Sequence, residues 1–167
     1  MENGLTIEHA ASIEKYAEEL ADLLIAVVND GASIGFLPPM GRAEAKSYWE
    51  GVLAPDVRLY VATLEGRITG TVQVHFCSKA NGRHRAEIAK LMTHPGYRRR
   101  GIGRALMREA EVRVREFGIR LLVLDTRDGD PSNLLYASLG YVLAGSIPGY
   151  ALSSNGQLDP TNLYYKV

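Results

Sequence analysis

The sequence contains little cysteine and no excess of charge of either sign. Cys77 is the single cysteine among 167 residues, so it has no partner for an intramolecular disulfide. Lys and Arg together number 19, as do Asp and Glu. This balance excludes an overall electrostatic preference for nucleic acid or for an anionic membrane. Any anion-binding site must therefore come from local clustering of basic residues.

Long apolar runs and metal-binding patterns are absent as well. The longest apolar stretch, Leu20 to Val28, is interrupted by Asp22 and is too short to span a bilayer. Met1 to Gly4 lacks the basic region that precedes the apolar core of a signal peptide, so we expect a cytoplasmic protein. The histidines show no metal-ligand spacing, and we therefore expect no metal site. They are His9, His75, His84 and His94.

Hydrophobic periodicity and turn residues predict a mixed α/β fold in one domain over residues 1–167. Apolar segments of strand type predict strands at residues 5–7, 57–63, 68–76, 87–92, 121–124, 141–147 and 163–167. Helical spacing predicts helices at residues 13–27, 42–52, 105–117 and 132–139, the first of them capped by Ser12. Leu64 to Arg67 joins the second and third strands as a hairpin turn. No repeat, linker or low-complexity segment interrupts this order.

A turn rich in arginine and glycine, residues 98–103, separates a predicted strand from a predicted helix. Its sequence is Arg-Arg-Arg-Gly-Ile-Gly, and Arg104 follows it. Gly101 and Gly103 let the backbone approach a ligand closely, while the start of the helix presents unpaired N–H groups and the positive end of its dipole. The arginines add charge-assisted hydrogen-bond donors. This combination is typical of a site for a diphosphate.

Other interpretations of this turn compete with a diphosphate site. A basic surface turn that only starts a helix would use the same residues. A Walker A loop is excluded because no Gly-Lys-Ser/Thr ends the turn. A dinucleotide-binding loop would explain Gly101 and Gly103, with Asp125 at the end of the next strand. Against it, Leu106 stands at the third glycine position, and His94-Pro95-Gly96 separates the glycines from the preceding strand.

The segment from Leu91 to Leu106 resembles the cofactor motif of the GNAT superfamily of acyl-CoA N-acetyltransferases. That motif is Arg/Gln-x-x-Gly-x-Gly/Ala after a strand and a proline turn, and Arg98, Gly101 and Gly103 match it. A second family signature places Asn and Tyr on a helix that ends in Gly-aromatic. Its counterparts here are Asn133, Tyr136, Gly140 and Tyr141. The order of predicted elements is also similar to this fold over nearly the full chain.

The resemblance implies a fold, a cofactor and a set of residues that bind it. The implied fold has a central mixed, mostly antiparallel sheet of six to seven strands, splayed between the fourth and fifth strands and flanked by about four helices. The implied cofactor is acetyl-CoA. The implied cofactor-binding residues are Leu91, Met92, Thr93, Arg98, Arg99, Arg100, Gly101, Ile102, Gly103, Arg104, Asn133 and Tyr136. Asn133 has a second interpretation, in which it caps or supports its helix.

Acetyl transfer to an amine requires proton transfer, because an alkylamine with a pKa near 10 is only about 0.1% neutral at pH 7. Glu87, among apolar strand residues, and Asp125, at the carboxyl end of a strand, are the candidate bases. The alternative role of Glu87 is that of an exposed strand residue, and the alternative role of Asp125 is to form a turn. Tyr136 is the candidate acid for the departing thiolate, although tyrosines are commonly core aromatics. Cys77 has no adjacent base, which argues against an acetyl-cysteine intermediate.

Closer similarity is visible to the tabtoxin-resistance acetyltransferase branch of this superfamily. The similar segments are residues 30–39, 48–49, 84–91 and 124–127. This likeness implies that Glu87 and Asp125 handle protons and that the acceptor is a small amino-acid-like molecule with a primary amine. It also implies a role in toxin or antibiotic resistance. The candidate walls of the acceptor site are Phe36, Leu37, Trp49 and Tyr150, and core packing is the alternative role for the three aromatic side chains among them.

Two rival functions remain open from the sequence. A protein or peptide N-acetyltransferase would need an open groove for the peptide. A CoA-binding regulatory module without turnover would need only the arginine turn, and the joint presence of Glu87, Asp125 and Tyr136 argues against it. We expect a small-molecule acceptor and neither nucleic acid nor membrane as a partner. Residues 163–165 offer a sheet edge for a homodimer, but completion of the sheet explains their alternation equally well.

Overall fold

The computed structural model describes residues 4–167, and the elements follow the predicted order. The described strands are β1 (Thr6–His9), β2 (Val57–Leu64), β3 (Arg67–Phe76), β4 (Arg85–Thr93), β5 (Leu121–Arg127), β6 (Val142–Leu152) and β7 (Leu158–Lys166). The described α-helices are α1 (Ala17–Asn29), α2 (Arg42–Glu50), α3 (Ile102–Glu116) and α4 (Ser132–Ser138). Residues 1–3, on which the expectation about a signal peptide partly rests, lie outside the described part of the chain.

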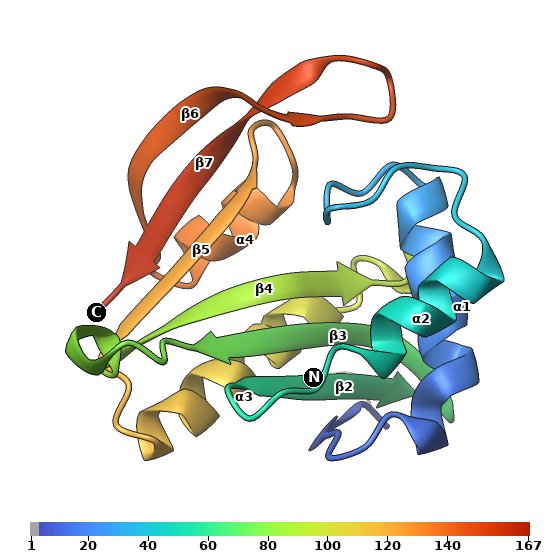
Figure 1. The fold of residues 1–167 in the computed structure, drawn as a ribbon, viewed down its shortest axis with the longest axis horizontal. Helices are drawn as coiled ribbons and strands as arrows, with labels where there is room; N and C mark the ends of the chain where they lie inside the picture. Colours follow the sequence, from blue (N-terminus) through green and yellow to red (C-terminus); the bar gives the residue numbers. More distant parts are fainter. Residues whose placement is uncertain (1–3) are drawn as a thin grey trace.

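The strands form one mixed sheet in the order β1-β2-β3-β4-β5-β7-β6. β4 and β5 run parallel, whereas the other neighbouring strands are antiparallel. The pairing of β4 with β5 joins Arg85–Glu87 to Leu121–Val123 and extends no further. Figure 1 shows that β5, β6 and β7 then diverge from β4. The predicted mixed sheet, splayed between its fourth and fifth strands, is confirmed.

A bulge in β4 lies next to this divergence. Lys90 has a φ of +51°, and the register between β3 and β4 shifts around it. Before the bulge, Ala86 and Ile88 pack in the core that contains α3. After it, Met92 packs in the core that contains α1 and α2. The bulge therefore shifts the alternation of β4 side chains by one residue, so that even-numbered residues point to opposite faces of the sheet before and after it. This shift occurs where β4 is no longer paired with β5.

Two hydrophobic cores cover opposite faces of the sheet. On one face, α3 packs through Leu106 and Met107, and Tyr136 of α4 joins the same core. On the other face, α1 and α2 pack through side chains that include Leu24 and Trp49. Successive residues of β2 alternate between the two cores, as the period of two in a strand requires. The helices thus hold both faces of β2, β3 and β4 and leave the diverging edge of β4 uncovered.

Two local predictions were wrong. Ser12 does not cap the first helix, because α1 begins at Ala17 after a 3₁₀ turn at Glu14–Tyr16 and has no side-chain cap. The last two strands are longer than predicted, since β6 continues through Pro148 and Gly149 and β7 begins at Leu158. Pro148 lies at a register shift on the outermost strand of the sheet, where a missing N–H does not interrupt the sheet interior.

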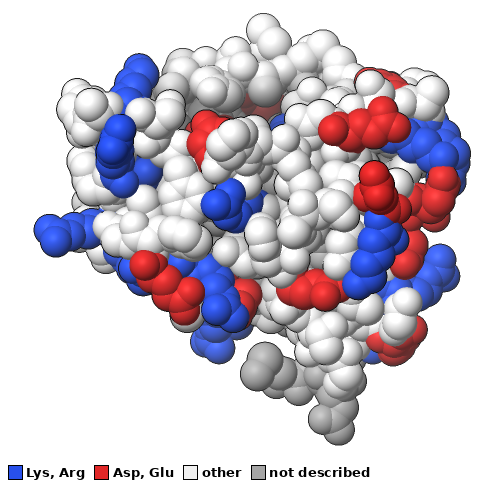
Figure 2. Space-filling model, turned by 60° about the horizontal axis from the view of Figure 1, so that its bottom comes forward, with Lys and Arg blue, Asp and Glu red and all other residues white. Residues whose placement is uncertain are grey.

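Charged residues of both signs are interspersed on the surface. Figure 2 shows one face, on which Lys and Arg alternate with Asp and Glu and with uncharged residues. Several of these charges form exposed ion pairs, such as that of Arg42 with Glu18. In the described part of the chain, no helix has the length and apolar character needed to cross a membrane. Residues 4–167 also contain no group of three or more His, Cys, Asp or Glu side chains that could hold a metal ion.

Candidate active site

A cleft of about 1080 Å³ follows the edge of β4 where β5 diverges from it. Its walls come from β4 at residues 87–93, from the arginine turn, from β5 at residues 125–127, from α4 and its preceding turn, and from the β6–β7 hairpin. Within the described chain, β4 has no ladder partner on its β5 side beyond Glu87. Backbone N–H and C=O groups of Leu91 to Thr93 on that side therefore remain available to a ligand with amide groups, such as the pantetheine arm of coenzyme A.

The arginine turn lines this cleft through its backbone and two of its arginines, and Arg104 after the turn adds a third. Gly101 has a left-handed φ of +78° and precedes α3, whose first turn has no side-chain cap. The N–H groups at the start of α3 therefore point to the cleft without a side-chain acceptor. Arg98, Arg99 and Arg104 line the cleft. These features fit the pyrophosphate that the sequence predicts.

The arginines of this region differ in their partners. Arg98 Nη1 lies 2.6 Å from Asp30 Oδ2, and Arg104 Nη2 donates to Ser138 Oγ at 2.8 Å. Both contacts are exposed to solvent, so a phosphate oxygen could replace Asp30 or Ser138 as the partner of the guanidinium group. Arg100 Nη2 lies 2.7 Å from Glu65 Oε1, and Arg100 is not among the residues that line the cleft.

Tyr136 brings a protonated phenol to the cleft. The side chain is almost completely buried, yet it lines the cleft. Burial raises the pKa of Tyr136 well above its ordinary value near 10, and the charges of Asp125 and Asp130 raise it further. The phenol is therefore protonated at neutral pH, and its position on the wall of the cleft would let it donate its proton to a bound molecule.

Glu87 and Asp125 face the same cleft from the two diverging strands. Glu87 is on β4, at the last position that pairs with β5, and it pairs in register with Val123. Asp125 is on β5, two residues beyond that pairing, and its Oδ2 lies 3.0 Å from Thr161 Oγ1. The structure thus brings together the three predicted proton-transferring residues, although they are separated in sequence.

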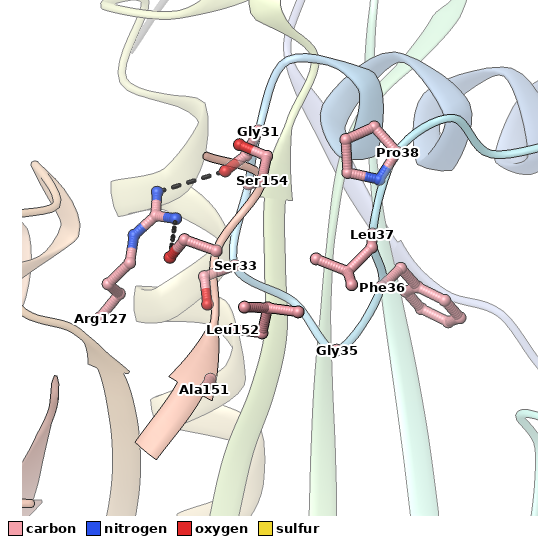
Figure 3. Close-up of a pocket in the computed structure, with 12 residues that line it drawn as sticks. Gly31, Ser33, Gly35, Phe36, Leu37, Pro38, Arg127, Ala151, Leu152 and Ser154 are labelled. Atoms are coloured by element: carbon pink, nitrogen blue, oxygen red, sulfur yellow. Dashed lines mark hydrogen bonds between the residues drawn. The ribbon is translucent and has the colours of Figure 1, made fainter. Parts of the chain in front are cut away.

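A smaller cavity of about 240 Å³ adjoins the cleft between the α1–α2 loop and the β6–β7 hairpin. Figure 3 shows Phe36, Leu37 and Pro38 on one side of it and Ala151 and Leu152 on the other. The two cavities share wall residues, namely Gly31, Ala32, Ser33, Gly35, Arg127 and Ala151. The small cavity therefore opens from the large one. The predicted wall residues Phe36 and Leu37 line the small cavity, and Tyr150 lines the cleft.

Arg127 connects the two sides of the small cavity. Its Nη2 donates to the carbonyl oxygen of Gly31 at 3.2 Å (Figure 3). Its Nη1 donates to Ser153 Oγ at 3.1 Å. Its Nε donates to Asp130 Oδ1 at 3.0 Å. One guanidinium thus holds the α1–α2 loop, the β6–β7 hairpin and the turn before α4 together. Arg127 lies in one of the segments that are similar to the tabtoxin-resistance branch, but the sequence pattern alone indicates no role for it.

Lys90 is a second residue whose place in the site was missed. Its Nζ donates to the carbonyl oxygen of Ile34 and lies 5.5 Å from the centre of the Phe36 ring. Burial lowers the pKa of Lys90, an effect that the charges of Asp125 and Glu87 partly offset. The sequence signal was available: a lysine within the apolar segment Ile88 to Met92 is unusual for a strand flanked by a core.

Besides Arg100, two predicted site residues line neither cavity. Trp49 is fully buried in the core with α1, and its Nε1 donates to the carbonyl oxygen of Leu20 at 2.8 Å. Trp49 therefore forms no wall of either cavity, and the core alternative describes it. Asn133 donates to the carbonyl oxygens of Arg127 and Asp130, and its Oδ1 accepts hydrogen bonds from Asn162 and Tyr164. Its amide supports the start of α4.

Known proteins share both the sequence pattern and the fold. A profile of the Acetyltransferase (GNAT) family matches residues 26–141. An uncharacterized N-acetyltransferase from the hisH-hisA intergenic region of Azospirillum brasilense is 32% identical over 113 residues, which are 66% of this chain and 67% of that protein.

Solved structures of low sequence identity superpose on nearly the full chain. Ribosomal-protein-alanine N-acetyltransferase from Brucella melitensis has a TM-score of 0.81 at 21% identity, covering 97% of this chain and 99% of that chain. A putative acetyltransferase from Salmonella typhimurium, solved with its cofactor acetyl-CoA, has a TM-score of 0.80 at 17% identity, covering 98% of this chain and 94% of that chain. At these identities, the superpositions establish a shared fold.

Proposed function

Because the chain belongs to the GNAT acetyltransferase family, whose members use acetyl-CoA, we propose that it acetylates the primary amine of a small amino-acid-like molecule. One observation carries the proposal. Glu87, Asp125 and Tyr136 line a single cleft, which also contains the arginine turn. A protein that only binds coenzyme A needs the turn but not two carboxylates and a protonated phenol beside it.

The geometry of the cleft supports a set of cofactor-binding roles. Bound acetyl-CoA supplies a thioester carbonyl as the electrophile. The start of α3 and the guanidinium groups of Arg98, Arg99 and Arg104 bind the pyrophosphate. Leu91 to Thr93 hydrogen-bonds the pantetheine arm through backbone groups that have no β5 partner. Arg100 contributes its charge at longer range, and Asn133 acts by holding α4, which carries Tyr136.

Glu87 and Asp125 remove the proton of the acceptor ammonium, directly or through a water molecule. The neutral amine then attacks the thioester carbonyl in a ternary complex, and Tyr136 donates its proton to the departing thiolate. The phenolate takes up the proton that the amine nitrogen loses as the amide forms. The raised pKa of Tyr136 favours return of the phenolate to the neutral form. No covalent enzyme intermediate is involved, and Cys77, which lies beside Gly82, does not line the cleft.

The small cavity favours a small acceptor over an extended peptide. Its volume of about 240 Å³ suits a compact side chain, and Arg127 holds its two walls together. Phe36, Leu37 and Leu152 supply an apolar lining, while serine hydroxyls supply a polar one. A peptide acceptor would instead extend from the cleft past Tyr150 of the hairpin, which is exposed.

A thiol-release assay with acetyl-CoA, corrected for hydrolysis, tests the proposal. The acceptor panel contains amino acids, polyamines, aminoglycosides and peptides. We expect thiol release with small amino-acid-like amines, and we expect Glu87→Gln combined with Asp125→Asn to abolish it without loss of coenzyme A binding. Release with peptides alone would support a protein N-acetyltransferase instead. Absence of release with every amine would support a binding module.

A further inference from the structure

We infer that the ammonium group of Lys90 binds a carboxylate of the acceptor, so that the substrate is an amine that also carries an anionic group. This inference rests on the proposed function and narrows its substrate class. It starts from the position of Lys90, which is on the β4 bulge and lines the cleft beside Glu87.

The ammonium group lies where the two cavities meet. Gly35 lines both cavities, and a Cβ atom placed on Gly35 would lie 2.9 Å from Lys90 Nζ. The Nζ atom is therefore in contact with the wall through which the small cavity opens into the cleft. A carboxylate bound to it would leave the rest of the same molecule within reach of both spaces.

Lys90 also lacks a carboxylate partner of its own. Within residues 4–167, none of the ion pairs shorter than 4.0 Å includes Lys90, whereas Arg127, the other cation at this junction, is paired with Asp130 at 2.9 Å. The bond to Ile34 and the contact with the Phe36 ring leave donor capacity on the ammonium group, which has three hydrogens. A half-buried cation with spare donors is suited to an anionic ligand.

The charges around Lys90 divide the site into complementary parts. Glu87 and Asp125 are close enough for their charges to act on Lys90, yet they remain available to the acceptor ammonium. An α-amino acid places its ammonium and its carboxylate on one carbon. Its ammonium then faces Glu87 and Asp125, its carboxylate faces Lys90, and its side chain enters the cavity of about 240 Å³.

The competing explanation is that Lys90 only holds the α1–α2 loop through Ile34 and Phe36. The two explanations differ in what the substrate must carry. If Lys90 only holds the loop, its loss would lower kcat/KM equally for an amino acid and for its carboxamide, which has the same side chain and amine but no negative charge. If Lys90 binds the carboxylate, its loss would lower kcat/KM for the amino acid alone.

The experiment measures kcat/KM for the standard L-amino acids and for their carboxamides with four proteins: wild type, Lys90→Met, Lys90→Arg and the exposed control Lys79→Met. For each protein, kcat/KM for the amino acid is divided by kcat/KM for its carboxamide. Dividing this ratio by the wild-type ratio cancels the different basicities of the two amines. We expect Lys90→Met to lower this ratio about 10- to 100-fold, the size of a lost charge-assisted hydrogen bond. Lys90→Arg should retain much of the wild-type acid-to-amide ratio, and Lys79→Met should leave the ratio unchanged.

An equal loss for acids and amides in Lys90→Met would overturn the inference while leaving the acetyltransferase proposal intact. If wild type releases no thiol with any amine, the proposed function fails separately. In that case, calorimetric titration of the same amino acids into the CoA-loaded protein still decides the role of Lys90. Binding lost in Lys90→Met would support it, and no binding to wild type, or equal binding to both proteins, would overturn it.

Discussion

Tyr136 and Tyr141 pack edge to face with ring centroids 5.9 Å apart, yet only Tyr136 lines the cleft. Both side chains are buried, and burial raises the pKa of both phenols. The Tyr141 hydroxyl is enclosed near Glu111, whose charge raises its pKa further. Two neighbouring phenols therefore share an environment and differ in access to a bound molecule, which makes each a control for the other.

Replacement of Tyr136 by Phe is expected to lower kcat about 100-fold or more, because the departing thiolate loses its proton donor. The dissociation constant for coenzyme A should stay within about twofold of wild type, since the ring and its packing are retained. Steady-state kinetics and calorimetry measure the two quantities. Tyr141→Phe should keep a kcat near that of wild type, and equal kcat in Tyr136→Phe and wild type would remove Tyr136 from the mechanism.

The same two phenols predict a loss of stability at alkaline pH. Their pKa values in the folded protein lie above the ordinary value near 10, so their contribution is complete below that pH. As pH rises above 10, the unfolded phenols ionise first and the free energy of unfolding falls, by up to about 1.4 kcal/mol per pH unit for each tyrosine. Urea unfolding between pH 8 and 11 measures this slope.

A double variant, Tyr136→Phe with Tyr141→Phe, should show a shallower decline in the free energy of unfolding over this range. Some decline remains, because burial also raises the pKa of Tyr48 and Tyr60. The exposed Tyr150 provides the control, since Tyr150→Phe removes a phenol that folding does not enclose. An identical slope in the double variant and in wild type would contradict the assigned cause.

The order of elements and the arginine turn were predictable because both depend on local sequence. Strand and helix periodicities, the hairpin turn at Leu64 to Arg67 and a left-handed glycine before a helix each need only a few neighbouring residues. The resemblance of two motifs to one family added the splay of the sheet. The register shift that extends β6 through Pro148 was not predictable, because it depends on pairing with β7.

The residues that complete the candidate site depend on contacts between distant segments. Lys90 bonds to a residue 56 positions away, and Arg127 bonds to one 96 positions away. Neither contact leaves a periodic pattern in the sequence. The burial of Trp49 also depends on contacts between separate segments. Its aromatic character suited a wall of the acceptor site, and only the packing of α2 on α1 shows that it is buried.

Loss of the Arg127 guanidinium is expected to open the small cavity. Arg127→Met removes the bonds to Gly31 and Ser153 and leaves Asp130 without its cation. We expect KM for the amine to rise about tenfold while KM for acetyl-CoA changes less than twofold, with a loss of about 1–3 kcal/mol in the free energy of unfolding. Hydrogen exchange at residues 31–38 and 151–154 should accelerate.

Arg127→Lys retains the charge but cannot reach three segments at once, so it should share most of the rise in KM. Arg120→Met, on the exposed residue just before β5, is the control for loss of an arginine. Unchanged hydrogen exchange in both segments of Arg127→Met would show that the hairpin and the loop keep their positions without the guanidinium.

The two glycines of the arginine turn should respond differently to substitution by alanine. Gly101 has a φ of +78°, and an alanine there adopts a left-handed conformation at a cost of about 1–2 kcal/mol in the free energy of unfolding. A Cβ atom on Gly103 would meet Leu135 Cδ2 at 3.5 Å and Thr93 Oγ1 at 3.7 Å, which are ordinary contacts. Gly103→Ala should therefore fold with nearly wild-type stability.

Gly103→Ala should also keep its dissociation constant for coenzyme A within about twofold of wild type, because the family motif accepts alanine at this position. At Gly101 the motif requires glycine, and the left-handed turn there sets the direction of the N–H groups at the start of α3. We therefore expect Gly101→Ala to raise the dissociation constant for coenzyme A about tenfold, a loss of about 1.4 kcal/mol. Urea unfolding and calorimetric titration of both alanine variants measure stability and affinity separately. Wild-type affinity in a folded Gly101→Ala protein would mean that binding of the pyrophosphate does not depend on this turn.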